Sequence, residues 1–434
     1  MIDFVIKKLN SLNLEDFVVL FFKNRDRMIR FTNNSITVTK DKTGSALFIY
    51  MAKERKRIAG ATYDLRKGEI ASFISSLYKS MMASSETEYA HLPRGPFRYV
   101  HNGDIDTKIG EEDLTPYVSR AIYSALENGA KRVAGSLSAF ITNIEIFTSG
   151  GAEGRDIRTG IELNVRAFTS KESSGHGIAV STRLSSFNPE EAGRLAGMYS
   201  KMAKNPKTVR EGRYRVLLSS TVAANIFEHV GISTSAFMVE AGLSFFKDKI
   251  GEKVAVSNLT LIDHGQIQGG LDSRSFDDEG LPTKSNKLID SGILLTYIHN
   301  STTAKKFKTE STANAGIIEP HPWNLEVKSG DMDDDEMIRE LKSGIIVTNN
   351  WYTRFQSYRT GEFSTIPRDA AFLVENGEVK ASIHGFRLSD SIPRLLNSIS
   401  GIGKKRRWIK WWEVETPTLS PQIIVDGMTV TKAL

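Results

Sequence analysis

The sequence predicts an α+β fold of two domains, a mixed N-terminal α/β domain and a strand-rich C-terminal domain. Many segments have the near-period-two spacing of strands, few have helical periodicity, and the two kinds do not alternate as regular βαβ units. The chain has 434 residues, 40% of them hydrophobic and 25% charged, which is enough for two buried cores. We place the boundary at Asn205-Pro206-Lys207, so the predicted domains are residues 1–205 and 206–434.

The first half is predicted to contain strands and helices in alternation. The strands carry β-branched and aromatic residues and are expected at Phe17–Phe22, Met28–Thr39, Gly44–Met51, Ser136–Phe147 and Gly160–Thr169. Their turns are expected at Asn33-Asn34, Asp41–Gly44 and the glycine-rich Ser149–Thr159. The helices show apolar stripes at helical spacing and are expected at Asp64–Met82, Glu111–Asn128 and Pro189–Ala203.

The second half is predicted to be mostly strand and turn. It begins with a short strand, Tyr214–Leu218, and a long helix from about Thr221 to Lys249. One more helix is well signalled, because the acidic run Asp333–Glu336 suits the positive end of a helix and Gly344 suits its end. This structural explanation of the acidic run is preferred to a metal site.

The composition excludes several classes of protein. With 57 Lys and Arg against 51 Asp and Glu, the net charge of +6 is spread along the chain and does not indicate nucleic-acid binding. The absence of cysteine excludes disulfides, thiolate zinc sites and cysteine nucleophiles, and it fits a reducing compartment. The N-terminus does not resemble a signal peptide and the longest apolar run, Phe17–Phe22, is too short for a membrane helix. We therefore expect a soluble, cytoplasmic protein without membrane contact.

Three short blocks follow one another in residues 269–316. They are Asp277-Asp278-Glu279-Gly280-Leu281-Pro282, Leu288-Ile289-Asp290-Ser291-Gly292-Ile293-Leu294 and Ser311-Thr312-Ala313-Asn314. The first has the composition of a tight turn, and the second that of two short strands around a turn at Asp290–Gly292. In order and spacing the blocks resemble the DDEG-x-P, LI-x-x-G-x-L and S-T-G-N blocks of the TldD/PmbA family. The resemblance covers nearly the whole chain and implies a TldD/PmbA-type fold.

The resemblance also shows where a metal site would be expected. Catalytic members of the family are similar to one another in an H-E-x-x-x-H segment, whose histidines bind zinc and whose glutamate polarises the metal-bound water. The matching segment here is Phe227–Ile232, with Glu228 at the glutamate position and Phe227 and Ile232 at the ligand positions. The family's remaining ligand, a cysteine near the C-terminus, has no counterpart. His229 does not replace a ligand, because a helix turns about 100° per residue and His229 therefore lies on a different face.

What the resemblance implies is a TldE/PmbA-like subunit without a metal or catalytic site of its own. Such a chain pairs with a TldD-like chain that carries the zinc, and the pair encloses a chamber in which unfolded or leader-type peptides are cut. For contacts with an extended peptide we select Ser311, Thr312 and Asn314, whose hydroxyl and amide groups can bond a peptide backbone. A loop that bonds only to itself is the alternative. Ala313 stands where the family usually has glycine, which is unfavourable if that position requires a positive φ.

Three other functions stay open. The chain could be a metalloprotease in its own right, with an atypical site assembled for instance from His264, His299 and Glu228. It could be a DNA- or gyrase-associated regulator that binds through the basic, aromatic segment Lys404–Trp412, although we expect a strand there first, a protein interface second and a nucleic-acid site last. It could also be a homodimer that has kept the shell of the complex and lost the activity.

Overall fold

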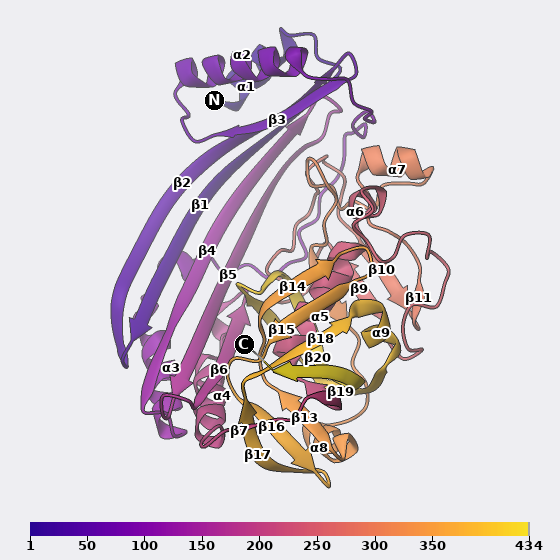
Figure 1. Cartoon of the computed structure of the whole chain (residues 1–434). Helices are drawn as coiled ribbons and strands as arrows, with labels where there is room; N and C mark the ends of the chain where they lie inside the picture. Colours follow the sequence, from indigo (N-terminus) through magenta and orange to yellow (C-terminus); the bar gives the residue numbers. More distant parts are fainter. Residues whose placement is uncertain (433–434) are drawn as a thin grey trace.

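Two β-sheets organise the chain in the computed structural model, which describes residues 1–432 (Figure 1). One sheet has six long strands from the first part of the chain, and the other has fourteen strands from the second part. The six-stranded sheet curves around one side of the second half, with helices at both of its ends (Figure 1). This arrangement confirms the predicted α+β fold with a strand-rich second half.

The first sheet is antiparallel throughout. Its strands are β1 (Asp16–Thr32), β2 (Ser35–Lys53), β3 (Lys56–Thr62), β4 (Arg132–Thr148), β5 (Glu153–Phe168) and β6 (Ser174–Ser181). They lie in the order β3-β2-β1-β4-β5-β6. The helices of this half are α1 (Ile2–Asn10), α2 (Lys67–Ala83), α3 (Thr115–Glu127) and α4 (Pro189–Met202).

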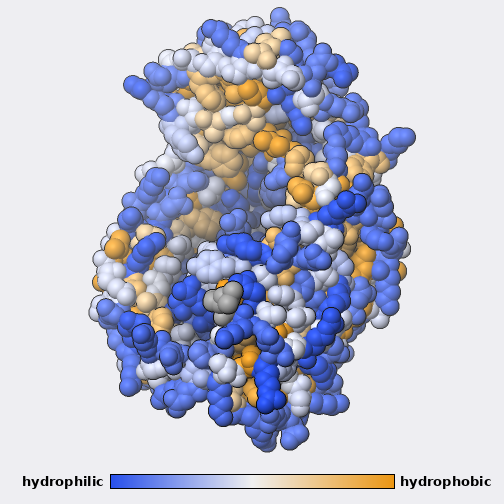
Figure 2. All heavy atoms as spheres, viewed as in Figure 1, coloured by the Kyte–Doolittle hydropathy of each residue, from blue (hydrophilic) through white to orange (hydrophobic). Residues whose placement is uncertain are grey.

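Side chains alternate along the strands, so the first sheet contributes to different cores on its two faces. Phe17 and Val19 of β1 pack in one core with α1 and α2, whereas Val18 and Leu20 pack in another with Phe276 of the second half. At the other end of the sheet, α3 and α4 cover a third core. Figure 2 shows hydrophobic side chains in a hollow between the α1–α2 end of the sheet and the second half.

The first sheet has longer strands than the sequence predicts. The turn at Asn33-Asn34 is confirmed, and both residues have the positive φ, 49° and 66°, that a tight hairpin requires. The turn predicted at Asp41–Gly44 is wrong, because β2 continues through it and Asp41 accepts hydrogen bonds from Arg25 of β1 at 3.1 and 2.7 Å. Continuous pairing with β1 from Asn24 to Arg27, with this ion pair across the two strands, thus keeps these turn-forming residue types in a strand. The turn predicted at Ser149–Thr159 is also too long, since β5 begins at Glu153.

The change from the first sheet to the second falls at the predicted boundary, Asn205–Lys207, between α4 and β7. That residues 1–205 and 206–434 are separate domains stays a prediction. The two parts are joined by ion pairs, among them Arg158 with Asp272 at 2.9 Å and Arg166 with Asp369 at 2.6 Å.

Within residues 206–432, the second half contains fourteen strands, most of them short, and five helices. The strands are β7 (Lys207–Thr208), β8 (Gly212–Leu218), β9 (Leu261–His264), β10 (Ser285–Asp290), β11 (Ile293–Leu294), β12 (Asn324–Val327), β13 (Gly344–Val347), β14 (Trp351–Ser357), β15 (Glu362–Ile366), β16 (Ala371–Glu375), β17 (Glu378–His384), β18 (Phe386–Ser391), β19 (Ile399–Trp411) and β20 (Val414–Lys432). The helices are α5 (Ser220–Ser233), α6 (Ala236–Glu240), α7 (Ser301–Phe307), α8 (Asp334–Leu341) and α9 (Ile392–Asn397). The main core of this half forms around α5, and a smaller core under α8 contains the alternate residues of β8 and β20.

The helix predicted from Thr221 to Lys249 is too long. The helix α5 ends at Ser233, and the backbone of the next residues pairs with Ile298 instead: the Ile298 N–H donates to the Thr234 carbonyl at 2.9 Å, and the Ala236 N–H donates to the Ile298 carbonyl at 3.0 Å. The Thr234 hydroxyl also bonds back to the carbonyl of Gly231 at 2.7 Å, which helps to end the helix. A contact distant in sequence therefore interrupts a segment with good helical periodicity.

Two other predictions for this half are confirmed. Asp333 caps α8, in a capping box in which Asp333 and Glu336 bond each other's backbone N–H at 2.8 Å. The basic segment lies mostly in the strand β19, with Ile409 and Trp411 buried at 3% and 2% exposure.

Among residues 1–432, no helix combines the length and the apolar character that crossing a membrane requires.

Candidate functional site

The helix α5 places two neighbouring residues in opposite environments. Ser219 caps its start by accepting a hydrogen bond from the Val222 N–H at 3.4 Å. Phe227 is completely buried in the main core, whereas Glu228 lies on the other side of the helix and lines a cavity. Ile232, one turn after Glu228, lines the same cavity. The face of α5 that holds the family's glutamate position therefore borders open space.

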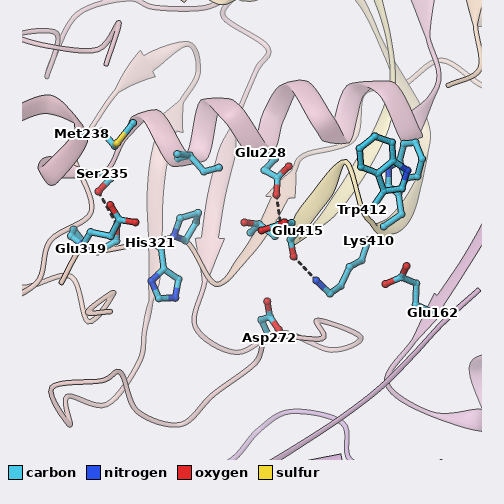
Figure 3. Close-up of a pocket in the computed structure, with 15 residues that line it drawn as sticks. Glu162, Glu228, Ser235, Met238, Asp272, Glu319, His321, Lys410, Trp412 and Glu415 are labelled. Carbon is cyan, nitrogen blue, oxygen red and sulfur yellow. Dashed lines mark hydrogen bonds between the residues drawn. The ribbon is translucent and has the colours of Figure 1, made fainter. Parts of the chain in front are cut away.

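The cavity has a volume of about 760 Å³ and lies between α5, the segment Glu319–Pro322 and the turn that joins β19 to β20 (Figure 3). Carboxyl groups from five separate parts of the chain line it, namely Glu162, Glu228, Asp272, Glu319 and Glu415. Lys410 and His321 also reach it, and Trp411 and Trp412 form part of its wall.

Glu228 is a buried acid, with 4% of its surface exposed. Its Oε1 accepts a hydrogen bond from the Thr416 N–H at 2.6 Å. Burial outweighs this bond and raises the pKa of Glu228 to about 7. Burial lowers the pKa of His321, which is therefore neutral at pH 7, and the ammonium of Lys410 donates to the carbonyl of Glu415 at 2.5 Å.

The residues at the family's ligand positions are not metal ligands here. Phe227 and Ile232 have no coordinating atom, and only Ile232 borders the cavity. Within residues 1–432, no three His, Asp or Glu side chains converge as a metal site would require. His264 is bonded to Ser285 at 2.8 Å and to Glu326 at 2.9 Å, and His299 lies near Thr303 at 3.3 Å. The structure therefore does not assemble His264, His299 and Glu228 into a metal site.

The three residues predicted to contact a peptide lie in a densely bonded loop outside this cavity. Asn314 is completely buried and its amide donates to Asp263 at 2.6 Å and to the His321 carbonyl at 3.0 Å. The Thr312 hydroxyl accepts from the His299 N–H at 2.7 Å, and the Ser311 hydroxyl donates to the His299 carbonyl at 3.1 Å. These bonds hold the segment that carries His321. Peptide contact at Ser311, Thr312 and Asn314 stays a prediction.

Ala313 occupies a backbone position that favours glycine. Its φ is +56°, in the left-handed region, where the side chain of an L-residue is unfavourable by about 1–2 kcal/mol. Its carbonyl accepts a hydrogen bond from the Trp323 indole at 3.1 Å, which helps to hold this conformation. The loop thus keeps the geometry expected where the family has glycine, at a cost in backbone strain.

A pair of glycine substitutions measures this strain. Ala313 and Ala315 are both buried, at 3% and 0% exposure, but only Ala313 has a positive φ. We expect Ala315→Gly to lower the free energy of unfolding by about 1 kcal/mol, through the lost methyl group and the more flexible unfolded chain. Ala313→Gly loses the same contributions but relieves the strain, so we expect it to stay within about 0.5 kcal/mol of the parent. Denaturant unfolding of both variants checks this, and equal destabilisation would contradict it.

Sequence reasoning selected Glu228 but missed the groups that surround it. Glu162 lies on β5 of the first sheet, Asp272 and Glu319 lie in loops, and Glu415 lies on β20. No spacing in the sequence brings these four segments together. The local signal is the basic, aromatic segment Lys404–Trp412, which lies just before Glu415 and predicts a strand first and a protein interface second.

The comparison with known proteins assigns the family. Residues 211–432 match the model of the PmbA/TldA metallopeptidase C-terminal domain, and residues 105–204 match that of the central domain. The chain belongs to the PmbA/TldD metallopeptidase family. The resemblance inferred from the three sequence blocks is thereby confirmed.

Curated relatives and solved structures of the PmbA/TldD family agree with this assignment. The chain is 33% identical to a metalloprotease of Methanocaldococcus jannaschii over 46% of its own length and 45% of the relative's. It is 27% identical to the metalloprotease PmbA of Escherichia coli O157:H7 over 50% and 46% of the two lengths, so these alignments span about half of each relative. TldE from Thermococcus kodakarensis has the same fold, with a TM-score of 0.87 at 19% identity over 99% of both chains. A Thermotoga maritima protein with the provisional name of DNA gyrase modulator gives a TM-score of 0.87 at 22% identity over 99% of this chain and 100% of its own.

Proposed function

We propose that this chain is the non-catalytic, TldE/PmbA-like subunit of a zinc metalloprotease complex that degrades or processes unfolded or leader-type peptides in the cytoplasm. Its partner would be a TldD-like chain that carries the zinc, and this chain would bind none. The observation that carries the proposal is the environment of α5: the first ligand position holds Phe227, which is part of the hydrophobic core, and the second holds Ile232. At the positions that the resemblance aligns with the zinc motif, this chain has the glutamate but no group that would hold a metal next to it.

The physical reason is that glutamate alone is a weak catalyst of peptide hydrolysis. The family chemistry needs a metal to acidify the attacking water and to stabilise charge on the peptide oxygen. Glu228 can accept a proton near pH 7, but no ligand set lies beside it among residues 1–432. We therefore assign peptide hydrolysis to the partner, and we assign the walls of the chamber and contacts with the substrate to this chain.

Metal analysis tests the proposal directly. We expect the purified chain to contain far less than one equivalent of zinc, and the complex co-expressed with a TldD-like chain from the same genome to contain about one equivalent per pair. Near-stoichiometric zinc in the isolated chain would make it a metalloprotease in its own right. A stable homodimer that forms no complex with the TldD-like chain would also overturn the assignment.

A matched pair of substitutions separates the two chains in the complex. Glutamine at the motif glutamate of the partner should abolish peptide hydrolysis, since it removes the general base at the metal. Glu228→Gln in this chain should lower kcat less than tenfold, because no reacting group depends on it. Loss of hydrolysis to background with Glu228→Gln, in a complex that still forms and still binds zinc, would give this chain a catalytic role.

A further inference from the structure

We propose that the cavity beside α5 binds a basic side chain, lysine or arginine, of an extended peptide, and that an adjoining aromatic cavity holds a neighbouring part of the same peptide. The inference deepens the proposed function by naming the chemical class of peptide that this subunit contacts. It depends on the proposed function only for the claim that this peptide is the substrate of the complex.

The charge of the cavity favours a cation. Five carboxyl groups line it, against the single ammonium of Lys410 (Figure 3). Asp272 is neutralised by Arg158 at 2.9 Å. In the part of the chain that the structure describes, the other four carboxyl groups, Glu162, Glu228, Glu319 and Glu415, form no salt bridge. Burial raises the pKa of Glu162 and Glu228, and a cation bound beside them would act in the opposite direction, as Lys410 does, and favour their ionised forms.

The wall of the cavity is suited to the same ligand. Trp412 is 47% exposed, and its ring centroid lies 5.7 Å from that of Trp411 and 5.0 Å from that of Trp351. Aromatic faces attract lysine and arginine, and the attraction is stronger where water is partly excluded. Carboxylates beside the exposed indole ring of Trp412 therefore provide both the charge and the apolar surface that a long basic side chain needs.

A second cavity, of about 430 Å³, shares part of this wall. Glu162, Trp411 and Trp412 line both cavities, and the second is otherwise lined by the first sheet and by Trp351. Apolar side chains from the first sheet, including Met28 and Phe168, border it. A chain segment that crosses the shared wall would place one side chain among the carboxylates and a neighbouring one among the aromatic rings.

Two indole N–H groups lack a partner at this wall, which is an observation independent of the charge. Trp411 is 2% exposed, and neither its Nε1 nor that of Trp351 has a hydrogen-bond acceptor among residues 1–432. Buried indole N–H groups normally find an acceptor. Both nitrogens are buried, so a bound peptide would reach them only if the wall rearranged. The adjoining aromatic cavity is what favours a peptide, because it has room for the side chain next to the basic one.

Peptide titration of the purified full chain tests the inference, with tryptophan fluorescence as the readout. The probe is an acetylated, amidated hexapeptide with a central lysine followed by phenylalanine. It is compared with peptides that carry norleucine or glutamate in place of the lysine, and with a non-acetylated norleucine peptide. We expect the lysine peptide to bind at least tenfold more tightly than the acetylated norleucine peptide, with the preference falling as salt is added. Tight binding of the non-acetylated norleucine peptide alone would assign the site to a terminal ammonium and overturn the side-chain assignment.

Substitutions on the exposed rim locate the site. Glu319→Gln with Glu415→Gln should reduce the preference for lysine to less than threefold, and Trp412→Ala should weaken all the peptides. All three residues are exposed, so these variants should fold, and circular dichroism checks that they do. Glu310→Gln, an exposed acid that does not line either cavity, is the matched control and should leave the preference unchanged.

The outcomes also separate this inference from the proposed function. Equal affinity for the lysine and norleucine peptides, a preference for glutamate, or no binding by the chain or its complex would overturn the inference. A preference for lysine in a chain that also contains stoichiometric zinc would support the site and overturn the proposed function. A zinc-free chain that does not prefer the lysine peptide would overturn the site and leave the proposed function supported.

Discussion

Replacing Phe227 by histidine is expected to lower the free energy of unfolding by about 3 kcal/mol. The phenyl ring is completely buried in the main core, and truncation of such a ring costs about 3–5 kcal/mol. Histidine recovers part of the volume but buries a polar ring without a partner, which costs about 1–3 kcal/mol. The family's ligand type is therefore expected to be among the less tolerated residues at this position.

Ile232→His is the matched control for this substitution. Ile232 is only partly buried and lines the cavity, so its imidazole can remain hydrated and the cost should be about 1 kcal/mol or less. The two variants are compared by denaturant unfolding followed by tryptophan fluorescence, because all five tryptophans lie between residues 323 and 412. Similar destabilisation by both would contradict the difference that we assign to their environments.

The double variant Phe227→His, Ile232→His tests whether the two histidines alone are enough to create a metal site. We expect no stoichiometric zinc, since position 227 does not border the cavity and the chain has no cysteine to act as the third ligand. Elemental analysis after dialysis checks this. One equivalent of zinc in a folded double variant would show that the helix α5 can turn position 227 toward the cavity.

Glu228→Gln is expected to stabilise the protein by about 3 kcal/mol at pH 8 and to have little effect at pH 4.5. The carboxyl has a pKa of about 7 in the folded chain, against an ordinary value of 4.5. Between these two values the folded chain holds a proton that the unfolded chain has lost, so the stability of the parent falls as the pH rises through this window. A shift of one pKa unit corresponds to about 1.4 kcal/mol of stability. Glutamine does not ionise, so the variant does not lose stability as the pH rises. Its side-chain oxygen can still accept the hydrogen bond from the Thr416 N–H.

Unfolding at pH 5, 6, 7 and 8 measures this effect, which should grow with pH and level off above about pH 7. Glu415→Gln is the control, because this acid lines the same cavity but is exposed, and its substitution should change the stability by less than about 0.5 kcal/mol at every pH. A constant difference across the pH series would show that the folded carboxyl is not protonated in this range. A stabilising Glu228→Gln would also indicate that a destabilising acid has been retained at this position, as is common where an acid serves function.

The sequence alone determined the local features whose causes are local. The hairpin at Asn33-Asn34, the capping box of α8 and the turn at Asp277–Gly280 follow from residue types that bond their own backbone or accept a positive φ. The ordered blocks in residues 269–316 were sufficient to identify the family. Phe227 and Ile232 have no coordinating atom at the two positions where the resemblance implies zinc ligands.

The tertiary structure decided everything that depends on segments distant in sequence. Backbone pairing with Ile298 ended the helix α5, and continuous backbone pairing with β1 extended β2 through an expected turn. The cavity around Glu228 exists because β5, two loops and the β19–β20 turn meet beside α5. A sequence shows which side chains can be charged, but burial and neighbouring charges set the charge that each one carries. Those are properties of the assembled fold, and for this reason the acidity of Glu228 and the unpaired charge of its cavity could not be predicted from the chain alone.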